Sequence, residues 1–198
     1  RLIPSGVAVA LLFAAGAAAA VVSGAAAPGF TITDTTGKAV RLADYKGKFV
    51  VLEWTNPECP FVRKHYSSGN MQGLQKEWAG RDVVWLAINS TNASHSEFKP
   101  PREMASWMQS QGASPAATLL DSTSATGRAY SAKTTPHMFV VDPGGKVVYA
   151  GAIDDKRSSN PADVKTAKNY VRAALAEATA GRPVTVASTT PYGCSVKY

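Results

Sequence analysis

A short apolar run that leads into a Cys-Pro pair constrains this chain more than any other feature. Residues 49–52 read FVVL, which is typical of a buried strand, and the turn signal Asn56-Pro57 follows before a charged, helix-like segment. Cys59 therefore lies between a predicted strand and a predicted helix. Pro60 suits the first turn of that helix, because proline lacks the N–H that a helix leaves unpaired there. We predict that Cys59 is the N-cap of the helix.

A thiol at a helix N-terminus is a candidate nucleophile. The free backbone N–H groups and the helix dipole stabilise a thiolate and lower a cysteine pKa from about 8.5 into the range of about 3.5–7.5. Glu58 opposes a thiolate at Cys59, whereas Arg63, Lys64 and His65 favour one. The alternative is that Cys59 fills the core, since free cysteine is among the most buried residue types. We favour the nucleophile, because open α/β sheets keep their chemistry at such strand ends.

Length and charge bound the classes of protein that this chain can represent. Its 198 residues are enough for one domain with a proper core, and a hydrophobic content of 45% is ordinary for a globular protein. The net charge is +7, but the Lys and Arg residues are scattered and form no basic run. We therefore predict no nucleic-acid partner.

The first 27 residues differ from the rest of the chain. Arg1 precedes the apolar run VAVALLFAAGAAAAVV at residues 7–22, and residues 23–27 are small, as a signal peptidase requires. The run is shorter than the ~20 residues that a membrane-spanning helix needs. We predict a signal peptide over residues 1–27 and export, to the periplasm in a bacterium. An uncleaved anchor is the alternative, and it is the one predicted contact with a membrane.

The remaining pattern alternates strands and helices. A hairpin is predicted around the turn at residues 34–37, strands over 49–54, 83–88, 116–120, 137–141 and 147–150, and helices over 71–78, 102–111, 122–130 and 161–180. Uniformly apolar strands suit a sheet that is covered on both faces. We predict one domain over residues 28–182 and a C-terminal tail over residues 183–198, which carries Cys194.

This order of elements resembles the thioredoxin fold. The expected class is therefore α/β, with a central mixed β-sheet flanked by helices and an N-terminal β-hairpin extension. Thr134-Thr135-Pro136 resembles the cis-proline loop of that fold, in which the residue before the proline offers its backbone to an incoming chain and the proline lies against the active cysteine. The resemblance implies a substrate site that includes Trp54, Pro60, Thr135 and Pro136.

Longer segments narrow the resemblance. FTITDTTGKAVRLADYKGKFVVLEW and TLLDSTSATGRAYSAKTTPHMFVVD are similar to redoxins, and NPECPFVRKHYSSGNMQ with GCSVKY is similar to exported peroxiredoxin-like, AhpC/TSA-domain proteins. The chain departs from both relatives. Val62 replaces the second cysteine of a thioredoxin, so no local dithiol exists. Asn56 stands where peroxiredoxins have threonine, with Thr55 one place early, and Thr135 lies near the place of their arginine.

Three functions fit these residues. In the first, a thiol oxidoreductase, Cys59 attacks a peroxide or a disulfide, Thr55, Asn56 and Arg63 activate it, and Cys194 resolves the product. This function requires a thiol reductant and no cofactor. The alternative is that Cys194 is a structural partner or a free thiol.

In the second, Cys59 joins His65 and His137 to hold a soft metal such as copper. The third is a binding domain without catalysis, which the missing cysteine and arginine favour. We take the first function and predict no metal.

Overall fold

The computed structural model describes residues 21–198, so most of the predicted signal peptide lies outside the described residues. Residues 24–27 run along residues 145–147, where the Gly24 N–H donates to the Val147 carbonyl at 2.7 Å and the Ala27 N–H to the Gly145 carbonyl at 2.9 Å. Within residues 21–198, no helix has both the length and the hydropathy needed to cross a membrane.

Strands and helices alternate along the chain much as predicted. The strands are β1 (Thr31–Thr33), β2 (Ala39–Arg41), β3 (Phe49–Trp54), β4 (Val83–Asn89), β5 (Ala117–Leu120), β6 (Thr134–Thr135), β7 (His137–Val141), β8 (Val147–Gly151) and β9 (Cys194–Ser195). The α-helices are α1 (Pro60–Ser67), α2 (Asn70–Trp78), α3 (Pro101–Ser110), α4 (Ala125–Ala129) and α5 (Tyr170–Thr179), and two 3₁₀ helices are η1 (Leu42–Tyr45) and η2 (Pro161–Thr166).

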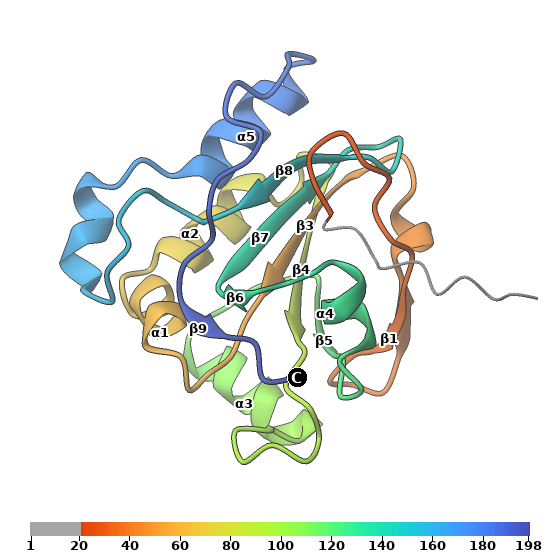
Figure 1. Cartoon of the computed structure of the whole chain (residues 1–198), viewed down its shortest axis with the longest axis vertical. Helices are drawn as coiled ribbons and strands as arrows, with labels where there is room; N and C mark the ends of the chain where they lie inside the picture. The colour runs from red at the N-terminus through yellow and green to blue at the C-terminus, as the bar shows by residue number, and fades with distance from the viewer. Residues whose placement is uncertain (1–20) are drawn as a thin grey trace, which may run out of the picture.

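A five-stranded mixed sheet forms the centre of the molecule. Its strand order is β5-β4-β3-β7-β8, with β3, β4 and β5 parallel and β7 antiparallel to both β3 and β8. Helices α1, α2, α3 and α5 cover one face, and α4 and the β1-β2 hairpin cover the other (Figure 1). The predicted thioredoxin-like α/β class with its N-terminal hairpin is confirmed.

The apolar run in β3 is buried on both faces of the sheet. Val51 joins the core beneath the helices, whereas Val50 and Leu52 join the core beneath the hairpin and α4. Because successive strand residues point to opposite faces, a strand covered on both sides must be apolar throughout. This burial explains why the strand could be recognised from sequence.

The predicted helix over residues 161–180 is wrong in its first half. The segment is divided into the 3₁₀ helix η2 and the α-helix α5, and Ala167 between them is extended. The chain there binds the loop after β8 instead: the Lys168 N–H donates to the Asp155 carboxylate at 2.9 Å, and Asn169 pairs with Asp154. The Asn169 side chain then accepts from the Arg172 N–H at 2.8 Å and begins a new helix. Tertiary hydrogen bonds outweigh the helical spacing here.

We expect Asn169→Ala to lower the free energy of unfolding by about 1 kcal/mol, because the N-terminal N–H groups of α5 lose their side-chain acceptor. Urea denaturation of both proteins measures the difference. Gln109→Ala, an exposed change inside α3, is the control and should leave stability within about 0.5 kcal/mol of the wild type. Equal stability of the Asn169→Ala and wild-type proteins would contradict the assigned cap.

The C-terminal tail runs along β8 at the edge of the sheet and then along β6. Residues 187–189 bind β8, where the Thr189 N–H donates to the Ala150 carbonyl at 3.1 Å, and β9 then pairs with β6 (Figure 1). The Lys197 carbonyl finally accepts from the Asn92 N–H at 2.7 Å. The tail is therefore fixed to the domain at several points and belongs to its structure.

Candidate functional site

The corner between β3 and α1 places Cys59 at the N-cap of α1, as predicted. Asn56 shapes the turn before it: its side-chain oxygen accepts from the Glu58 N–H at 2.8 Å, and its backbone carbonyl accepts from the Cys59 N–H at 3.1 Å. The Asn56 amide donates to the Glu97 carboxylate at 2.7 Å. Asn56 therefore holds the corner in shape.

The Cys59 thiol faces the predicted cis-proline loop. The Thr135-Pro136 peptide is cis, as predicted, and both residues are buried. The Cys59 thiol donates to the Thr135 carbonyl at 2.9 Å and is only 1% exposed. Pro60 is exposed next to it. The structure thus brings together Cys59, Pro60, Thr135 and Pro136.

Cys194 lies beside the same loop. β9 runs antiparallel to β6, with Cys194 directly opposite Thr135 and Ser195 opposite Thr134. Both cysteines are free thiols. Burial raises the pKa of the Cys194 thiol, and the neighbouring Cys59 thiol raises it further. Two cysteines that are far apart in the sequence therefore meet at one site.

Gly193 permits this close approach of the tail. Its φ is +138°, which favours glycine, and a Cβ at this position would stand 2.0 Å from the Thr135 carbonyl oxygen. Because the crowding atom belongs to the backbone, a larger residue could not be accommodated by a rotamer change. Glycine is thus required for Cys194 to reach Cys59.

The charges around the corner are paired with one another. The Arg63 side chain donates to the Pro57 carbonyl at 2.7 Å and to the Glu58 carboxylate at 2.9 Å. Lys99 contacts Glu58 at 3.0 Å, and the pKa of Glu58 is lowered by Lys99 first and then by Arg63. The cations neutralise the carboxylate beside Cys59, and the guanidinium of Arg63 is bound to Glu58 and Pro57.

Thr55 and Trp54 are buried at the end of β3. The Thr55 N–H donates to the Ile88 carbonyl at 2.9 Å, which continues the sheet by one residue. Trp54 packs on Tyr130 and Phe139, in the core on the opposite face from the one that contains Cys59. Its indole donates to the Ser90 hydroxyl at 3.0 Å. The structure does not bring Trp54 to the Cys59 thiol.

The two histidines of the alternative metal site do not gather at Cys59. His137 packs against Phe139, with ring centroids 4.5 Å apart, and its Nδ1 accepts from the Lys133 N–H. His65 lies next to Tyr192 instead. Among residues 21–198, no group of three or more His, Cys, Asp or Glu side chains is arranged to hold a metal ion.

Glu53 is a buried carboxyl group in β3 that is not among the site residues predicted from the sequence. It is fully buried, and it accepts from the Tyr66 hydroxyl at 2.8 Å and from the Trp85 indole at 2.7 Å. Burial raises its pKa to about 7, although these hydrogen bonds act in the opposite direction. The signal in the sequence was a single acid inside an otherwise apolar strand.

The raised pKa predicts that Glu53 makes stability depend on pH. The folded protein keeps the proton up to about pH 7, whereas the unfolded chain releases it near pH 4.5, so the contribution is present at low pH and lost as pH rises. The stability of the wild type relative to Glu53→Gln should fall by about 1.4 kcal/mol per pH unit between these values.

Urea denaturation of both proteins from pH 5 to pH 8 measures this difference. Subtracting the Glu53→Gln curve removes the contributions of the histidines and of the other groups that titrate in this range. A stability difference that stays constant across the series would contradict the raised pKa of Glu53.

The fold and the site together define a class: a thioredoxin-like protein with one cysteine at the N-cap of α1 and a second on a tail strand beside the cis-proline loop. The AhpC/TSA family model matches residues 23–150. The chain belongs to the AhpC/TSA family.

Comparison with known proteins agrees with the thioredoxin-like fold of this class. The thiol-disulfide oxidoreductase ResA of Bacillus subtilis is 28% identical over 128 residues, which cover 61% of this chain and 62% of that protein, slightly less than two thirds of its length. An uncharacterized conserved protein from Geobacillus kaustophilus is 31% identical, with a TM-score of 0.78 over 89% of this chain and 92% of that one.

The thioredoxin domain of a thiol-disulfide oxidoreductase from Bacteroides vulgatus shares the fold. Its TM-score is 0.54 at 20% identity, over 74% of this chain and 98% of that one. Thioredoxin-like oxidoreductases are thus structural neighbours of this chain.

Proposed function

We propose that this protein is a thiol-disulfide oxidoreductase in which Cys59 is the nucleophile and Cys194 is its redox partner. One observation carries the proposal: Cys194 lies opposite Thr135 in the β6-β9 pair, and the Thr135 carbonyl oxygen accepts a hydrogen bond from the Cys59 sulfur at 2.9 Å. The likeness to a relative named as a thiol-disulfide oxidoreductase supports the same reaction class. Cys194 thereby serves as the second cysteine, because Val62 occupies the position that the second cysteine has in a thioredoxin.

The reaction has two exchange steps. The Cys59 thiolate attacks one sulfur of a substrate disulfide, which breaks that bond, releases the first substrate thiolate and leaves a mixed disulfide on Cys59. The Cys194 thiolate then attacks the Cys59 sulfur and releases the second substrate thiolate, so the products are a reduced substrate and a 59–194 disulfide. Each leaving thiolate takes up one proton. An external dithiol returns both cysteines to thiols and is itself oxidised.

The polar groups at the corner favour a disulfide over a peroxide as the oxidant. A peroxidase of this fold needs donors that hold the peroxide against the thiolate. Arg63 is bound to Pro57 and Glu58, and the Asn56 amide is bound to Glu97. Asn56 and Arg63, two of the three residues that could have replaced the usual threonine and arginine, are thus engaged in shaping the turn.

We also propose that the protein is exported through residues 1–27. Apolar and small residues of this kind suit a signal peptide, and export is consistent with a function in disulfide chemistry, because oxidising compartments are where protein disulfides persist. A thiol reductant must then reach the protein in the same compartment.

A turnover assay tests the function. The protein is supplied with dithiothreitol and either a disulfide-bonded peptide or hydrogen peroxide, and the loss of each oxidant is compared with the rate without protein. We expect catalysed reduction of the peptide disulfide to exceed that of peroxide. Faster consumption of peroxide, or no acceleration of either reaction, would overturn the proposal.

A further inference from the structure

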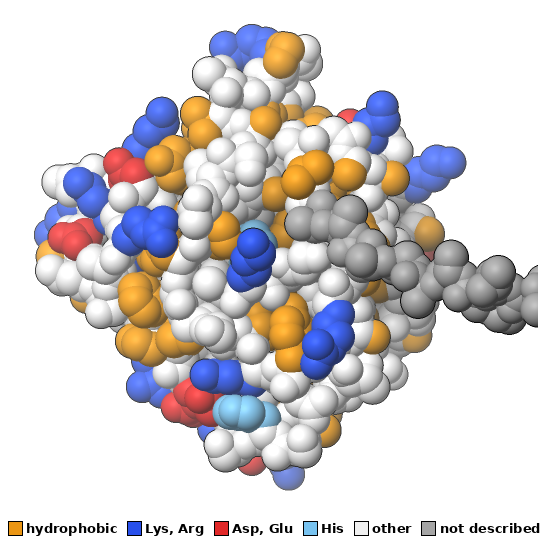
Figure 2. Space-filling model, viewed as in Figure 1, with side chains coloured by type: hydrophobic (Ala, Val, Ile, Leu, Met, Phe, Trp, Pro, Cys, Tyr) orange, Lys and Arg blue, Asp and Glu red, His pale blue; other side chains and the backbone are white. Residues whose placement is uncertain are grey.

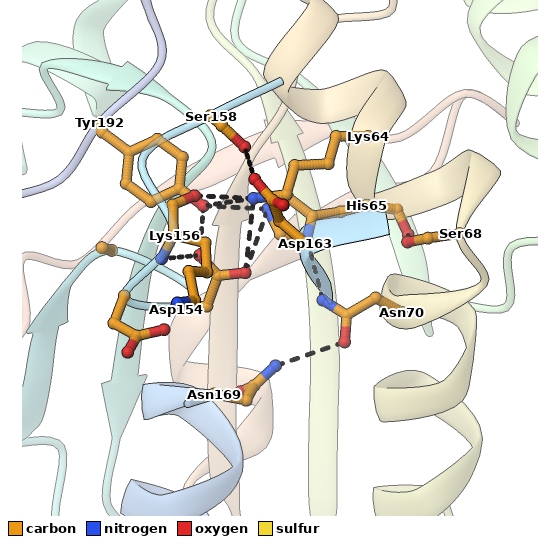
Figure 3. Close-up of polar contacts among 12 residues, drawn as sticks. Lys64, His65, Ser68, Asn70, Asp154, Lys156, Ser158, Asp163, Asn169 and Tyr192 are labelled. Carbon is orange, nitrogen blue, oxygen red and sulfur yellow. Dashed lines mark hydrogen bonds and ion pairs between the residues drawn. The ribbon is translucent and has the colours of Figure 1, made fainter. Parts of the chain in front are cut away.

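A buried ion pair lies about one and a half helical turns from Cys59. Lys64 projects from α1, Asp154 from the loop after β8, and their side chains are 0% and 1% exposed (Figure 3). The Lys64 ammonium also donates to the Lys156 carbonyl at 2.7 Å. A buried pair needs further hydrogen bonds to offset the cost of removing its charges from water. Yet the Lys64 nitrogen and the Asp154 Oδ2 are 3.7 Å apart, which is long for a direct hydrogen bond.

The hydroxyl of Tyr192 bridges the two members of this pair. It accepts from the Lys64 ammonium at 3.3 Å and donates to Asp154 Oδ1 (Figure 3). His65 contacts the same hydroxyl through Nε2 at 3.3 Å, while its Nδ1 faces the Asn70 amide at 2.9 Å. Because an amide nitrogen can only donate, Nδ1 is the acceptor and Nε2 carries the hydrogen. The hydroxyl therefore joins three buried side chains at one point.

Tyr192 belongs to the C-terminal tail, two residues before Cys194. The other members of the cluster belong to α1 and to the loop after β8, and α1 has Cys59 at its N-cap. The Tyr192 ring also packs edge-on against Phe61 of α1, with centroids 5.9 Å apart. The helix that carries the first cysteine therefore also holds the residue that fixes the second.

We propose that Tyr192 is a positioning residue that holds the Cys194 thiol against Cys59 by docking on the Lys64, His65 and Asp154 side chains. This inference rests on the proposed function. The step that it serves is the attack of the Cys194 thiolate on the Cys59 sulfur of the mixed disulfide, which forms the 59–194 disulfide and releases a substrate thiolate. Docking keeps the attacking sulfur close, so the step becomes effectively unimolecular.

Tyr192→Phe tests the docking, because it keeps the ring on Phe61 and removes the hydroxyl. Reduced protein is mixed with oxidised glutathione, quenched with acid at intervals, and analysed by mass spectrometry for the Cys59-glutathione mixed disulfide and for the 59–194 disulfide. A hydrogen bond to charged groups corresponds to about a tenfold effect or more. We expect conversion to the 59–194 disulfide to slow about tenfold, while formation of the mixed disulfide becomes faster, because a looser tail uncovers Cys59.

Tyr130→Phe is the matched control. Its hydroxyl donates to the Pro28 carbonyl at 2.8 Å, and its ring packs in the core on the other face of the sheet. The variant loses a tyrosine hydrogen bond whose acceptor, Pro28, lies outside the tail, and it leaves the Lys64, His65 and Asp154 contacts of Tyr192 intact, so both steps should keep their wild-type rates. Opposite changes in the two steps are a signature that a general loss of stability would not produce.

Hydrogen exchange shows whether the Tyr192→Phe protein is folded. Amide exchange should accelerate in residues 193–197 and stay unchanged in β3 and β4. Wild-type rates for both steps, or faster exchange throughout the sheet, would overturn the positioning role of Tyr192. A wild-type protein that forms the mixed disulfide but no 59–194 disulfide would instead overturn the proposed function on which this role depends.

Discussion

Cys59→Ser protein is expected to lose at least about a thousandfold of its disulfide-reducing activity, because a serine hydroxyl cannot replace the attacking thiolate. Cys194→Ser protein should still react once and then stop, with the substrate held on Cys59 as a mixed disulfide. Its turnover should fall about a hundredfold or more, since a free thiol in solution must replace one that the fold supplies at high effective concentration. The two variants should therefore differ in the size of their activity loss, and a mixed disulfide should accumulate only in Cys194→Ser.

Mass spectrometry of each variant after one equivalent of a disulfide-bonded peptide separates these outcomes. Ser195→Ala, the neighbour of Cys194 on β9, is the control and should turn over like the wild type. A Cys194→Ser protein with full activity would show that Cys194 takes no part in the reaction. An active Cys59→Ser protein would show that Cys59 is not the nucleophile.

Gly193→Ala is expected to detach the tail strand from the cis-proline loop. The added Cβ would lie 2.0 Å from the Thr135 carbonyl oxygen and 2.8 Å from its carbon, and a φ of +138° is strained for alanine. Such backbone conformations cost about 1–3 kcal/mol for a residue with a side chain, and the overlap adds to that cost. The tail must therefore move away from β6.

Two measurable effects follow from this movement. Cys59, only 1% exposed beneath the tail, should react with iodoacetamide at least about tenfold faster, and closure of the 59–194 disulfide should slow by a similar factor. Gly73→Ala in α2 is the control, since a Cβ at Gly73 meets no atom within 4 Å. Unchanged alkylation of Cys59 in Gly193→Ala would mean that the tail does not cover the thiol.

On the face of residues 21–198 that Figure 2 shows, the basic residues do not form a single patch. Figure 2 shows lysines and arginines spread over the visible face, with acidic side chains among some of them. Arg63 and Arg172 contact Glu58 and Glu77, respectively.

The fold was largely predictable because its signals are local. The apolar run of β3, the turn after it and Pro60 define the strand-to-helix corner within a dozen residues. The split between η2 and α5 was not predictable in this way. It depends on hydrogen bonds from Lys168 and Asn169 to the loop after β8, which periodicity within the segment does not report.

The site was predictable only in part for the same reason. Cys59 and the cis-proline loop carry recognisable neighbours in sequence, whereas the docking of Tyr192 joins α1, the loop after β8 and the tail. From sequence alone, these polar side chains would be expected on the protein surface. Their burial, and not their spacing, indicates their importance.

An equilibrium redox titration shows whether Cys59 and Cys194 form one redox couple. The protein is equilibrated in mixtures of reduced and oxidised dithiothreitol, quenched with acid, alkylated and mapped by mass spectrometry. We predict one two-electron transition in which Cys59 and Cys194 lose their thiols together and appear as an intramolecular 59–194 disulfide. Two thiols that titrate independently, or disulfides that link only separate chains, would contradict it.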